Sequence, residues 1–207
     1  MKKFTVFAVL LPALIVFSAC SSTPKVSRID ADTVVDLSGR WNDSDIRLVC
    51  ASLINDCLNS PRVAQYIQQF GGQNGGDLPA CLVGSFKNDS SEHIDTSIIS
   101  RSMEVAIVNS GKLDFVAGGD TREELRTERQ DQQTNASEET ASALGKETGA
   151  NLLLTGSVKS SVDQAGGTAV RSYFVYAELT NIQTNTRLWM GENSEIKKVI
   201  SRSGYRP

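Results

Sequence analysis

The sequence predicts a single layered α/β domain in which helices pack on one mixed β-sheet. A long amphipathic helix near the start is followed by alternating helical and strand-like segments. The last third of the chain then holds three strand-like segments in a row, separated by hairpin turn signals. The chain has 207 residues, which is enough for one domain with a substantial core.

The first two predicted helices follow a short alternating stretch that ends in a Ser-Gly turn. The first helix begins at Asp43 or Ser44, either of which can cap it. Its apolar residues recur at the spacing of one helical face: Ile46, Val49, Cys50, Leu53, Ile54, Cys57 and Leu58. Pro61 opens the second helix, expected over residues 63–70, because the Gly71-Gly72 pair then stops it.

The middle of the chain alternates between strand and helix. Residues 81–86 form a short apolar run, which is typical of a buried strand. Asp95 or Thr96 caps the next helix, and Gly111 ends it. Its inner face is expected to hold Ile98, Ile99, Met103, Ala106 and Ile107. A second strand is expected over residues 113–117.

Two more helices and three strands complete the predicted domain. The helices are expected over residues 121–133 and 137–148, the second closed by Gly149. The strands are expected over residues 151–162, 168–181 and 186–196, with hairpin turns at Gly166-Gly167 and residues 183–185. The expected order is therefore α-α-β-α-β-α-α-β-β-β.

The N-terminus has the pattern of an export signal that ends in a lipidated cysteine. Lys2 and Lys3 precede an apolar run over residues 4–17, and the small pair Ser18-Ala19 stands directly before Cys20. This pattern is typical of a bacterial lipobox, in which the Cys20 thiol is acylated and the chain is cut before it. The alternative is an ordinary cleaved signal peptide with an incidental cysteine.

This reading divides the chain into three parts. We expect a signal peptide over residues 1–19, a lipidated N-terminus with a short linker over residues 20–33, and a folded domain over residues 34–207. No second apolar run is long enough to span a bilayer, so we expect membrane attachment through Cys20 alone. Fully stretched, the polar linker from Ser21 to Asp32 reaches about 40 Å.

Charge and cysteine spacing exclude several classes of function. The net charge is −3, without a dense basic cluster, so we expect no nucleic-acid partner. Cys50 and Cys57 lie about 10.5 Å apart if they share a helix, too far for a disulfide. Either can pair with Cys81, or all three are buried apolar residues, the reading we favour. The single histidine, His93, and the lack of a Cys-x-x-Cys motif argue against a metal site, and we expect no cofactor.

The sequence offers no catalytic constellation. Gly145-Lys146-Glu147 resembles the end of a phosphate loop but lacks the upstream glycine spacing. His93 has no accompanying Gly-x-Ser-x-Gly motif and is expected in a surface turn. The pair Glu138-Glu139 stands where negative charge favours a helix N-terminus. We therefore expect no enzyme, no catalytic residues and no small-molecule substrate.

The predicted helix over residues 121–133 is unusual because Leu125 is its one apolar residue. Three arginines recur on one side of it, and three acidic residues recur on the other. The arginines are Arg122, Arg126 and Arg129, and the acids are Glu124, Glu128 and Asp131. Such segregated stripes find partners elsewhere in the domain or in water, or they form a docking face for another protein.

A second candidate surface is the aromatic strand between Arg171 and Thr180. It carries Tyr173, Phe174, Tyr176 and Leu179, with Trp189 opposite on the last strand. Such aromatic density indicates core packing first, and an interface if one face is exposed. We count Tyr173, together with the three arginines, among the candidate contact residues.

Several ordered stretches resemble one family of lipoproteins. They are Val35–Asp43, Ser90–Thr96, Arg122–Arg126, Asp131–Gln133, Gly149–Asn151, Leu154–Gly156 and the pair Thr184-Asn185 before Trp189. Together they resemble the LpoB-type lipoprotein activators of penicillin-binding proteins, from Val34 to about Ile200. The resemblance implies a fold like the N-terminal domain of TolB and no catalytic residues. It also implies an outer-membrane lipoprotein whose domain faces the periplasm and binds a peptidoglycan synthase, a class A penicillin-binding protein.

The linker departs from the family pattern. The best-known enteric activators cross the peptidoglycan layer on a long tether, whereas this linker has about a dozen residues. Ser21 after the cysteine resembles the signal for sorting to the outer membrane. We expect a non-enzymatic regulator that binds and activates a penicillin-binding protein. The alternative is a structural, secretion or assembly lipoprotein of the envelope that acts by protein interaction alone.

Overall fold

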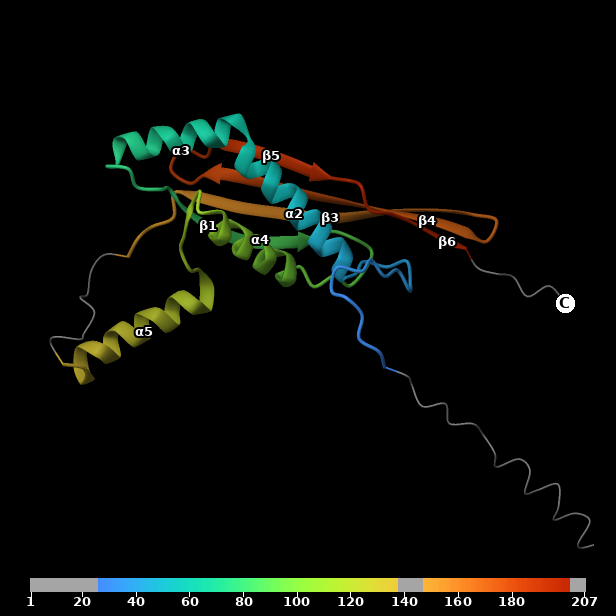
Figure 1. Cartoon of the computed structure of the whole chain (residues 1–207), viewed down its shortest axis with the longest axis horizontal. Helices are drawn as coiled ribbons and strands as arrows, with labels where there is room; N and C mark the ends of the chain where they lie inside the picture. Colours follow the sequence, from blue (N-terminus) through green and yellow to red (C-terminus); the bar gives the residue numbers. More distant parts are fainter. Residues whose placement is uncertain (1–25, 138–146, 202–207) are drawn as a thin grey trace, which may run out of the picture. The chain divides into compact units, whose positions relative to one another are not determined.

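The structure, a computed structural model, describes residues 26–137 and 147–201. The chain divides into two units, Met1–Thr33 and Val34–Pro207. In the first unit the described residues include a turn, in which the backbone N–H of Thr33 donates to the carbonyl of Asp30 over 3.1 Å. The second unit contains the helices and strands that follow (Figure 1).

The described elements alternate in the way the sequence predicts for a mixed α/β domain, and the expected fold class is confirmed. In chain order they are α2 (Asp43–Asn59), α3 (Pro61–Gln73), β1 (Ala80–Asn88), α4 (Ser97–Ser110), β2 (Asp114–Phe115), α5 (Gly119–Asn135), β3 (Leu152–Ala165), β4 (Thr168–Asn181), β5 (Arg187–Asn193) and β6 (Lys197–Ser201). Among the described residues, no helix combines the length and the apolar character needed to cross a membrane.

One mixed sheet joins all these strands in the order β2-β1-β3-β4-β5, with β6 paired to β4. β1 is parallel to β2 and β3, whereas β4 is antiparallel to β3, β5 and β6. The β3–β4 hairpin turns at Gly166 and Gly167, whose φ angles of 54° and 84° are readily adopted by glycine. β5 pairs with residues 175–180 of β4 and β6 with residues 168–172, so the two short strands follow one another along one edge of β4.

The alternation of β4 separates the two faces of the sheet. Tyr173, Val175, Ala177 and Leu179 are buried on the face that α2 contacts, while α4 contacts β1 and β2 (Figure 1). The intervening residues of β4 point to the other side, where they are half-buried or exposed. We call this second side the open sheet face, formed by Lys159, Phe174, Tyr176, Glu178 and Met190.

Helix α2 supplies the main apolar face against the sheet. All seven residues that the sequence predicts for its inner face are buried. The cap, however, is Asn42 rather than Asp43 or Ser44. The Asn42 side chain accepts from the N–H of Asp45 over 3.1 Å, and the Asp45 carboxylate accepts from the N–H of Asn42 over 2.9 Å. This reciprocal pair satisfies two backbone donors at the start of the helix.

Cys50, Cys57 and Cys81 are buried and free, as the favoured interpretation of their spacing predicts. Burial raises the pKa of each thiol to about 12, because the thiolate form would lose its hydration. The three residues therefore act as small apolar side chains of the core.

Two glycines in the sheet allow aromatic rings to lie directly on the strands. A Cβ atom on Gly156 would lie 2.3 Å from the Phe86 ring and 2.3 Å from the carbonyl oxygen of Tyr176. A Cβ atom on Gly191 would lie 2.1 Å from the ring of Trp189. The indole of Trp189 in turn donates to Asp56 of α2 over 2.8 Å, which ties the helix to β5.

Several predicted boundaries are wrong. Helix α3 continues through Gly71-Gly72 to Gln73, because the chain turns only at Gly75 and Gly76, where φ is 69° and 100°. On α4, Ile98 is 49 % exposed rather than part of the inner face, since Ile99, Met103 and Ile107 fill that face.

The end of the chain also differs from the expected order. Ser137 and residues 147–150 are not helical, so the predicted helix over 137–148 is wrong at both ends, and its middle lies outside the described residues. The last predicted strand, residues 186–196, divides into β5 and β6. The Asn193 side chain accepts from the N–H of Glu195 over 3.3 Å, a local turn that ends β5.

Candidate interaction surfaces

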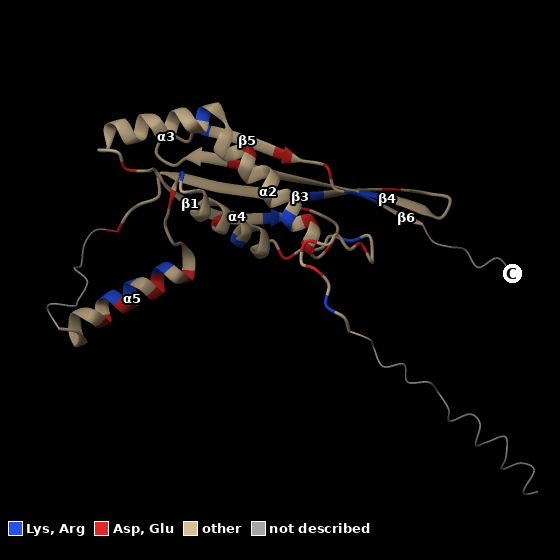
Figure 2. Ribbon diagram, in the orientation of Figure 1, with Lys and Arg blue, Asp and Glu red and all other residues tan. Residues whose placement is uncertain are grey.

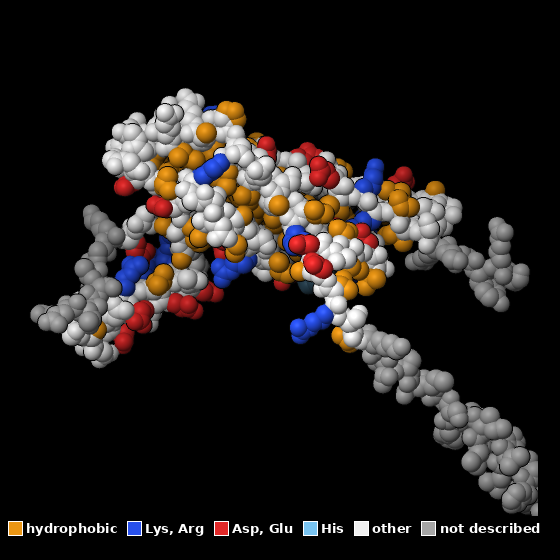
Figure 3. Space-filling model, viewed as in Figure 1, with side chains coloured by type: hydrophobic (Ala, Val, Ile, Leu, Met, Phe, Trp, Pro, Cys, Tyr) orange, Lys and Arg blue, Asp and Glu red, His pale blue; other side chains and the backbone are white. Residues whose placement is uncertain are grey.

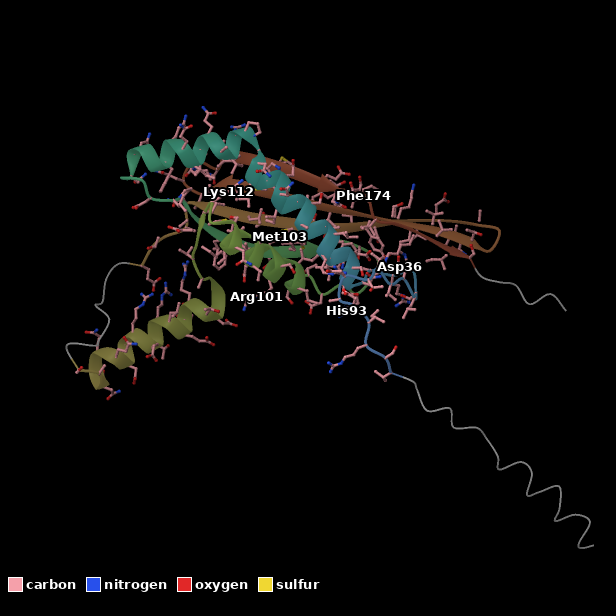
Figure 4. All side chains as sticks on the ribbon, viewed as in Figure 1. Asp36, His93, Arg101, Met103, Lys112 and Phe174 are labelled. Atoms are coloured by element: carbon pink, nitrogen blue, oxygen red, sulfur yellow. The ribbon has the colours of Figure 1, made fainter. Side chains whose placement is uncertain are left out.

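Several predicted sites fall where the structure gives no geometry. Cys20, the candidate lipid-attachment residue, lies outside the described residues, as do Glu138, Glu139, Gly145 and Lys146. His93 is exposed in the loop before α4, as the sequence predicts (Figure 4). Within the described ranges no group of histidine, cysteine and acidic side chains is arranged to hold a metal ion.

Helix α5 carries the predicted arginine stripe and has no buried residue along Gly119–Asn135. Arg122 donates to the carbonyl of Ala117 over 2.9 Å. Arg126 donates to both carboxylate oxygens of Glu147, over 2.8 Å and 3.1 Å, and Arg129 reaches the same carboxylate at 3.4 Å. Arg126 and Arg129 therefore converge on one acid of the same chain, while Arg122 binds a backbone carbonyl, in line with the intramolecular alternative that the sequence left open.

The Glu147 carboxylate is correspondingly perturbed. The hydrogen bonds from Arg126, together with the positive charges of Arg126, Arg129 and Arg122, lower its pKa below the ordinary value. The bidentate geometry with Arg126 fixes the carboxylate in one orientation. All of these groups are at the surface, so the pairs orient α5 more than they stabilise the fold.

The acidic stripe of α5 faces away from these arginines, and blue and red residues lie on opposite sides of the helix (Figure 2). Glu128 accepts from Gln132 over 2.9 Å, and Asp131 accepts from Asn135 over 2.8 Å. Among the described residues no salt bridge reaches Glu124, Glu128 or Asp131. The helix thus presents its negative side to solvent (Figure 3).

Tyr173, the aromatic candidate contact residue, lies in the core. Its side chain is 0 % exposed and packs edge-on against Trp41, with ring centroids 5.2 Å apart. Its hydroxyl donates to Glu92 over 2.9 Å, and burial raises the pKa of the phenol well above its ordinary value. A residue in this position supports the fold and cannot touch a partner without unfolding.

The exposed aromatic residue of β4 is Tyr176, which lies on the open sheet face, opposite to the buried face of Tyr173. Tyr176 is 37 % exposed and Met190, across the strand pair, is 64 % exposed. The amine of Lys159 lies 6.0 Å from the centre of the Tyr176 ring. A shallow cavity of about 450 Å³ runs beside these residues, with Lys87, Asp89 and Ser157 in its lining. The sequence analysis expects an interface here if one face of the aromatic strand is exposed. The exposure of Tyr176 and Met190 meets that condition.

A cluster of polar contacts that the sequence analysis did not identify joins the segment over residues 34–41, which we call the strap, to the rest of the fold. Glu92 forms an ion pair with Arg171 and accepts from the backbone N–H of Trp41 over 3.2 Å. The guanidinium of Arg171 also donates to the carbonyl of Gly39 over 3.4 Å. The strap is therefore bound to β4 by the same groups that hold Tyr173.

Lys198 of β6 forms the second half of this cluster. Its amine donates to Asp36 of the strap and to Asp45 of α2, both over 2.6 Å, and to the carbonyl of Arg40 over 2.9 Å. Burial alone would lower the pKa of Lys198, but the hydrogen bonds to the two carboxylates outweigh it and raise that pKa. One lysine thus joins the strap, a helix and a strand.

A signal for this cluster was present in the chain. The stretches Val35–Asp43 and Ser90–Thr96, which carry the family resemblance, contain Asp36, Trp41 and Glu92, and the fold brings these residues together. Their partners Arg171 and Lys198 lie in strands that read as ordinary alternating segments, so spacing alone could not have paired them.

Comparison with known proteins gives one matching family and several similar solved structures. The family model described as the peptidoglycan-synthase activator LpoB matches residues 45–195. The LpoB C-terminal domain from Salmonella enterica is 17 % identical, with 72 % of this chain and 98 % of that chain covered and a TM-score of 0.34. Lipoprotein GNA1162 from Neisseria meningitidis is 20 % identical, with 61 % and 88 % covered and a TM-score of 0.39. The LpoB C-terminal domain from Escherichia coli is 18 % identical, with 66 % and 96 % covered and a TM-score of 0.35. No curated protein matches the sequence.

Proposed function

This chain belongs to the family of the peptidoglycan-synthase activator LpoB, and from that membership we propose that its folded domain binds a class A penicillin-binding protein and raises its activity. The observation that carries the proposal is the extent of the family match, residues 45–195, which runs from the first turn of α2 to just beyond β5. The family is one of regulatory activators rather than enzymes.

The proposal includes an anchor at Cys20. Acylation of this residue would hold the domain at the outer membrane, facing the periplasm, with Ser21 as the sorting residue. The lipobox pattern of residues 14–20 supports it. A lipoprotein-type cysteine bears several acyl chains, and several chains give a stable anchor where one does not.

Activation requires more than binding. A partner shifts the equilibrium of a synthase only by the difference between its affinities for the active and the inactive conformation. The domain therefore acts by binding the active conformation of the synthase more tightly, without any chemistry of its own. Uniform binding to both conformations would leave the rate unchanged.

Two described surfaces supply contact residues for this purpose. On α5, Arg122 and Arg126 are the primary candidates, with Arg129 beside them, because the helix has no buried face and the Arg126 side chain stays 48 % exposed beside Glu147. On the open sheet face, Tyr176 takes the place of Tyr173, since aromatic residues and methionine are enriched in interfaces.

The test is a glycan polymerisation assay with purified class A penicillin-binding proteins and the mature chain. We expect stimulation by the wild-type chain and its loss when Arg122 and Arg126 are both replaced by Glu. Arg62→Glu is the matched control, because this arginine is exposed near the start of α3, which packs against α2 and β5 rather than against α5. Absence of stimulation for every synthase tested would overturn the activator function and leave an envelope lipoprotein that acts by interaction alone.

A further inference from the structure

Exposed apolar side chains gather where the strap meets the end of the β3–β4 hairpin and β6. Leu37 is 94 % exposed, Val199 66 %, Val34 60 % and Val162 46 %. Residues 36–39 of the strap and residues 197–201 of β6 line one hollow of about 380 Å³. Arg171 pairs in register with both Val162 and Lys198, so Val162 lies on the same face of the sheet as Lys198, whereas Val199 pairs with Val170 and points to the opposite face. We call these four residues the apolar tip.

The strap holds Leu37 outward instead of letting it turn into the core. On one side of it, the Asp36 carboxylate is fixed by Lys198, and on the other the Gly39 carbonyl accepts from Arg171. Gly39 has a φ of 68° and lies against Ile200 so closely that a Cβ atom would come within 2.4 Å of that side chain. The backbone around Leu37 is thus fixed on both sides, at Asp36 and at Gly39, and the fold keeps the Leu37 side chain exposed.

The length of the linker determines which surface the apolar tip can reach. Val34 is the first residue of the folded unit, and about a dozen linker residues separate it from Cys20. A flexible linker of that length has a relaxed span of about 20 Å. Once Cys20 is held in a bilayer, the tip is therefore kept near that surface at a high effective concentration.

The charge around the tip fits an uncharged lipid surface. Lys198 is shared between Asp36 and Asp45, so these three groups keep one net negative charge, and the exposed cations Arg40 and Lys197 beside them form no dense basic cluster. Attraction to anionic lipid is therefore weak, and contact depends on the apolar side chains, which gain by leaving water for the region between headgroups and acyl chains. In Figure 3 hydrophobic side chains are visible on the surface around this end of the hairpin.

We propose that the apolar tip, with Leu37 and Val199 at its centre, inserts into the interfacial layer of the bilayer that holds the acylated Cys20, so that the domain is docked on its own membrane rather than hanging free. The inference rests on the anchor in the proposed function and is independent of synthase activation.

A polarity-sensitive fluorophore on Leu37→Cys tests it in the full mature chain, acylated at Cys20 and anchored in phosphatidylcholine vesicles. Labelling is selective because Cys50, Cys57 and Cys81 are buried with a pKa of about 12. We expect a blue shift in emission and quenching by lipids that carry bromine on their acyl chains. Val105→Cys is the matched control, since Val105 is 52 % exposed on α4 and its label should show neither effect.

A second pair of variants distinguishes the contribution of the apolar tip from that of other exposed apolar side chains. In the Leu37→Cys background, Val199→Asp should reduce the quenching several-fold, while Val108→Asp, at a site 54 % exposed on α4, should leave it unchanged. If the chain attaches stably to the vesicles but the labels at positions 37 and 105 give equal, unquenched emission, the proposal that the tip docks would be overturned. The proposal of an anchor at Cys20 would stand. A chain that does not attach to the vesicles at all would overturn the anchor and the tip together.

Discussion

The amine of Lys198 lies 2.6 Å from the carboxylate of Asp45, although 153 positions separate the two residues in the chain. Both side chains are nearly removed from solvent, at 7 % and 6 % exposure. The same amine binds Asp36, so a single cation in β6 is shared between an acid of the strap and an acid of α2. The first and last elements of the described folded unit are held together at this point.

Replacing Lys198 by Met should therefore be costly. The substitution keeps much of the volume but leaves the Asp45 carboxylate buried without its cation, which costs about 3–5 kcal/mol in comparable sites. Urea unfolding would measure the loss. Arg101→Met removes an arginine that pairs with Glu104 at the surface, and should cost no more than about 1 kcal/mol. Equal effects of the two substitutions would contradict the buried role of Lys198.

The strap should loosen in acid. The hydrogen bond from Lys198 holds the pKa of Asp36 below its ordinary value, with Asn42 adding to the effect. A carboxyl group with a lowered pKa in the folded state contributes stability that is present above its unfolded pKa of about 3.9 and is lost as the pH falls through the folded value. Asp36→Asn lacks this contribution at every pH. The stability difference between wild type and Asp36→Asn should hence shrink below about pH 4, and a constant difference would argue against it.

The same change, glycine to alanine, should have opposite effects at two positions. Gly156→Ala forces a methyl group against the Phe86 ring and a backbone carbonyl, each 2.3 Å from the new atom, and should cost more than about 2 kcal/mol. Gly72→Ala meets no atom within 4 Å inside helix α3 and should stabilise by up to about 1 kcal/mol, since alanine favours helix. Thermal unfolding of the two variants side by side would show the sign of each effect.

The buried thiols of Cys50, Cys57 and Cys81 should not react with a thiol reagent until the protein unfolds. In a chain with Cys20→Ser, a thiol reagent at neutral pH should find no reactive group in the native protein, because burial raises the pKa of all three remaining cysteines to about 12. In denaturant all three should react. Rapid reaction of Cys50, Cys57 or Cys81 in the folded protein would mean that the helix–sheet interface opens readily.

Reversing the charge of Arg122 and Arg126 should abolish synthase binding and leave the unfolding midpoint nearly unchanged. The helix has no buried residue, so its charges contribute little to the fold. Because Arg126 also binds Glu147, the control is Glu147→Gln, which weakens the internal pair but keeps both arginines. Loss of binding in the arginine variant alone would assign the contact to the arginines. Equal loss in both variants would assign it to the orientation of α5, and full binding in both would exclude this face.

Patterns that repeat along the chain were predictable from the sequence. The inner face of α2, the exact span of β4 and the Gly166-Gly167 turn follow from local spacing, because period and turn chemistry act between neighbours. The predicted end of α3 at Gly71-Gly72 is wrong, since a glycine pair permits a turn without requiring one. Tyr173 failed as a contact residue for a related reason: alternation places it on one face of β4, but only the packed helices decide which face is buried.

By itself the sequence determined the fold class, the lack of a catalytic constellation, the segregated charges of α5 and a family resemblance that the match over residues 45–195 bears out. Only the tertiary structure decided that Arg126 and Arg129 converge on Glu147, that Tyr176 rather than Tyr173 faces solvent, and that Lys198 binds two distant acids. The reason is physical. Periodicity and capping are local, whereas burial and charge pairing depend on which segments the folded chain brings within a few ångströms of each other.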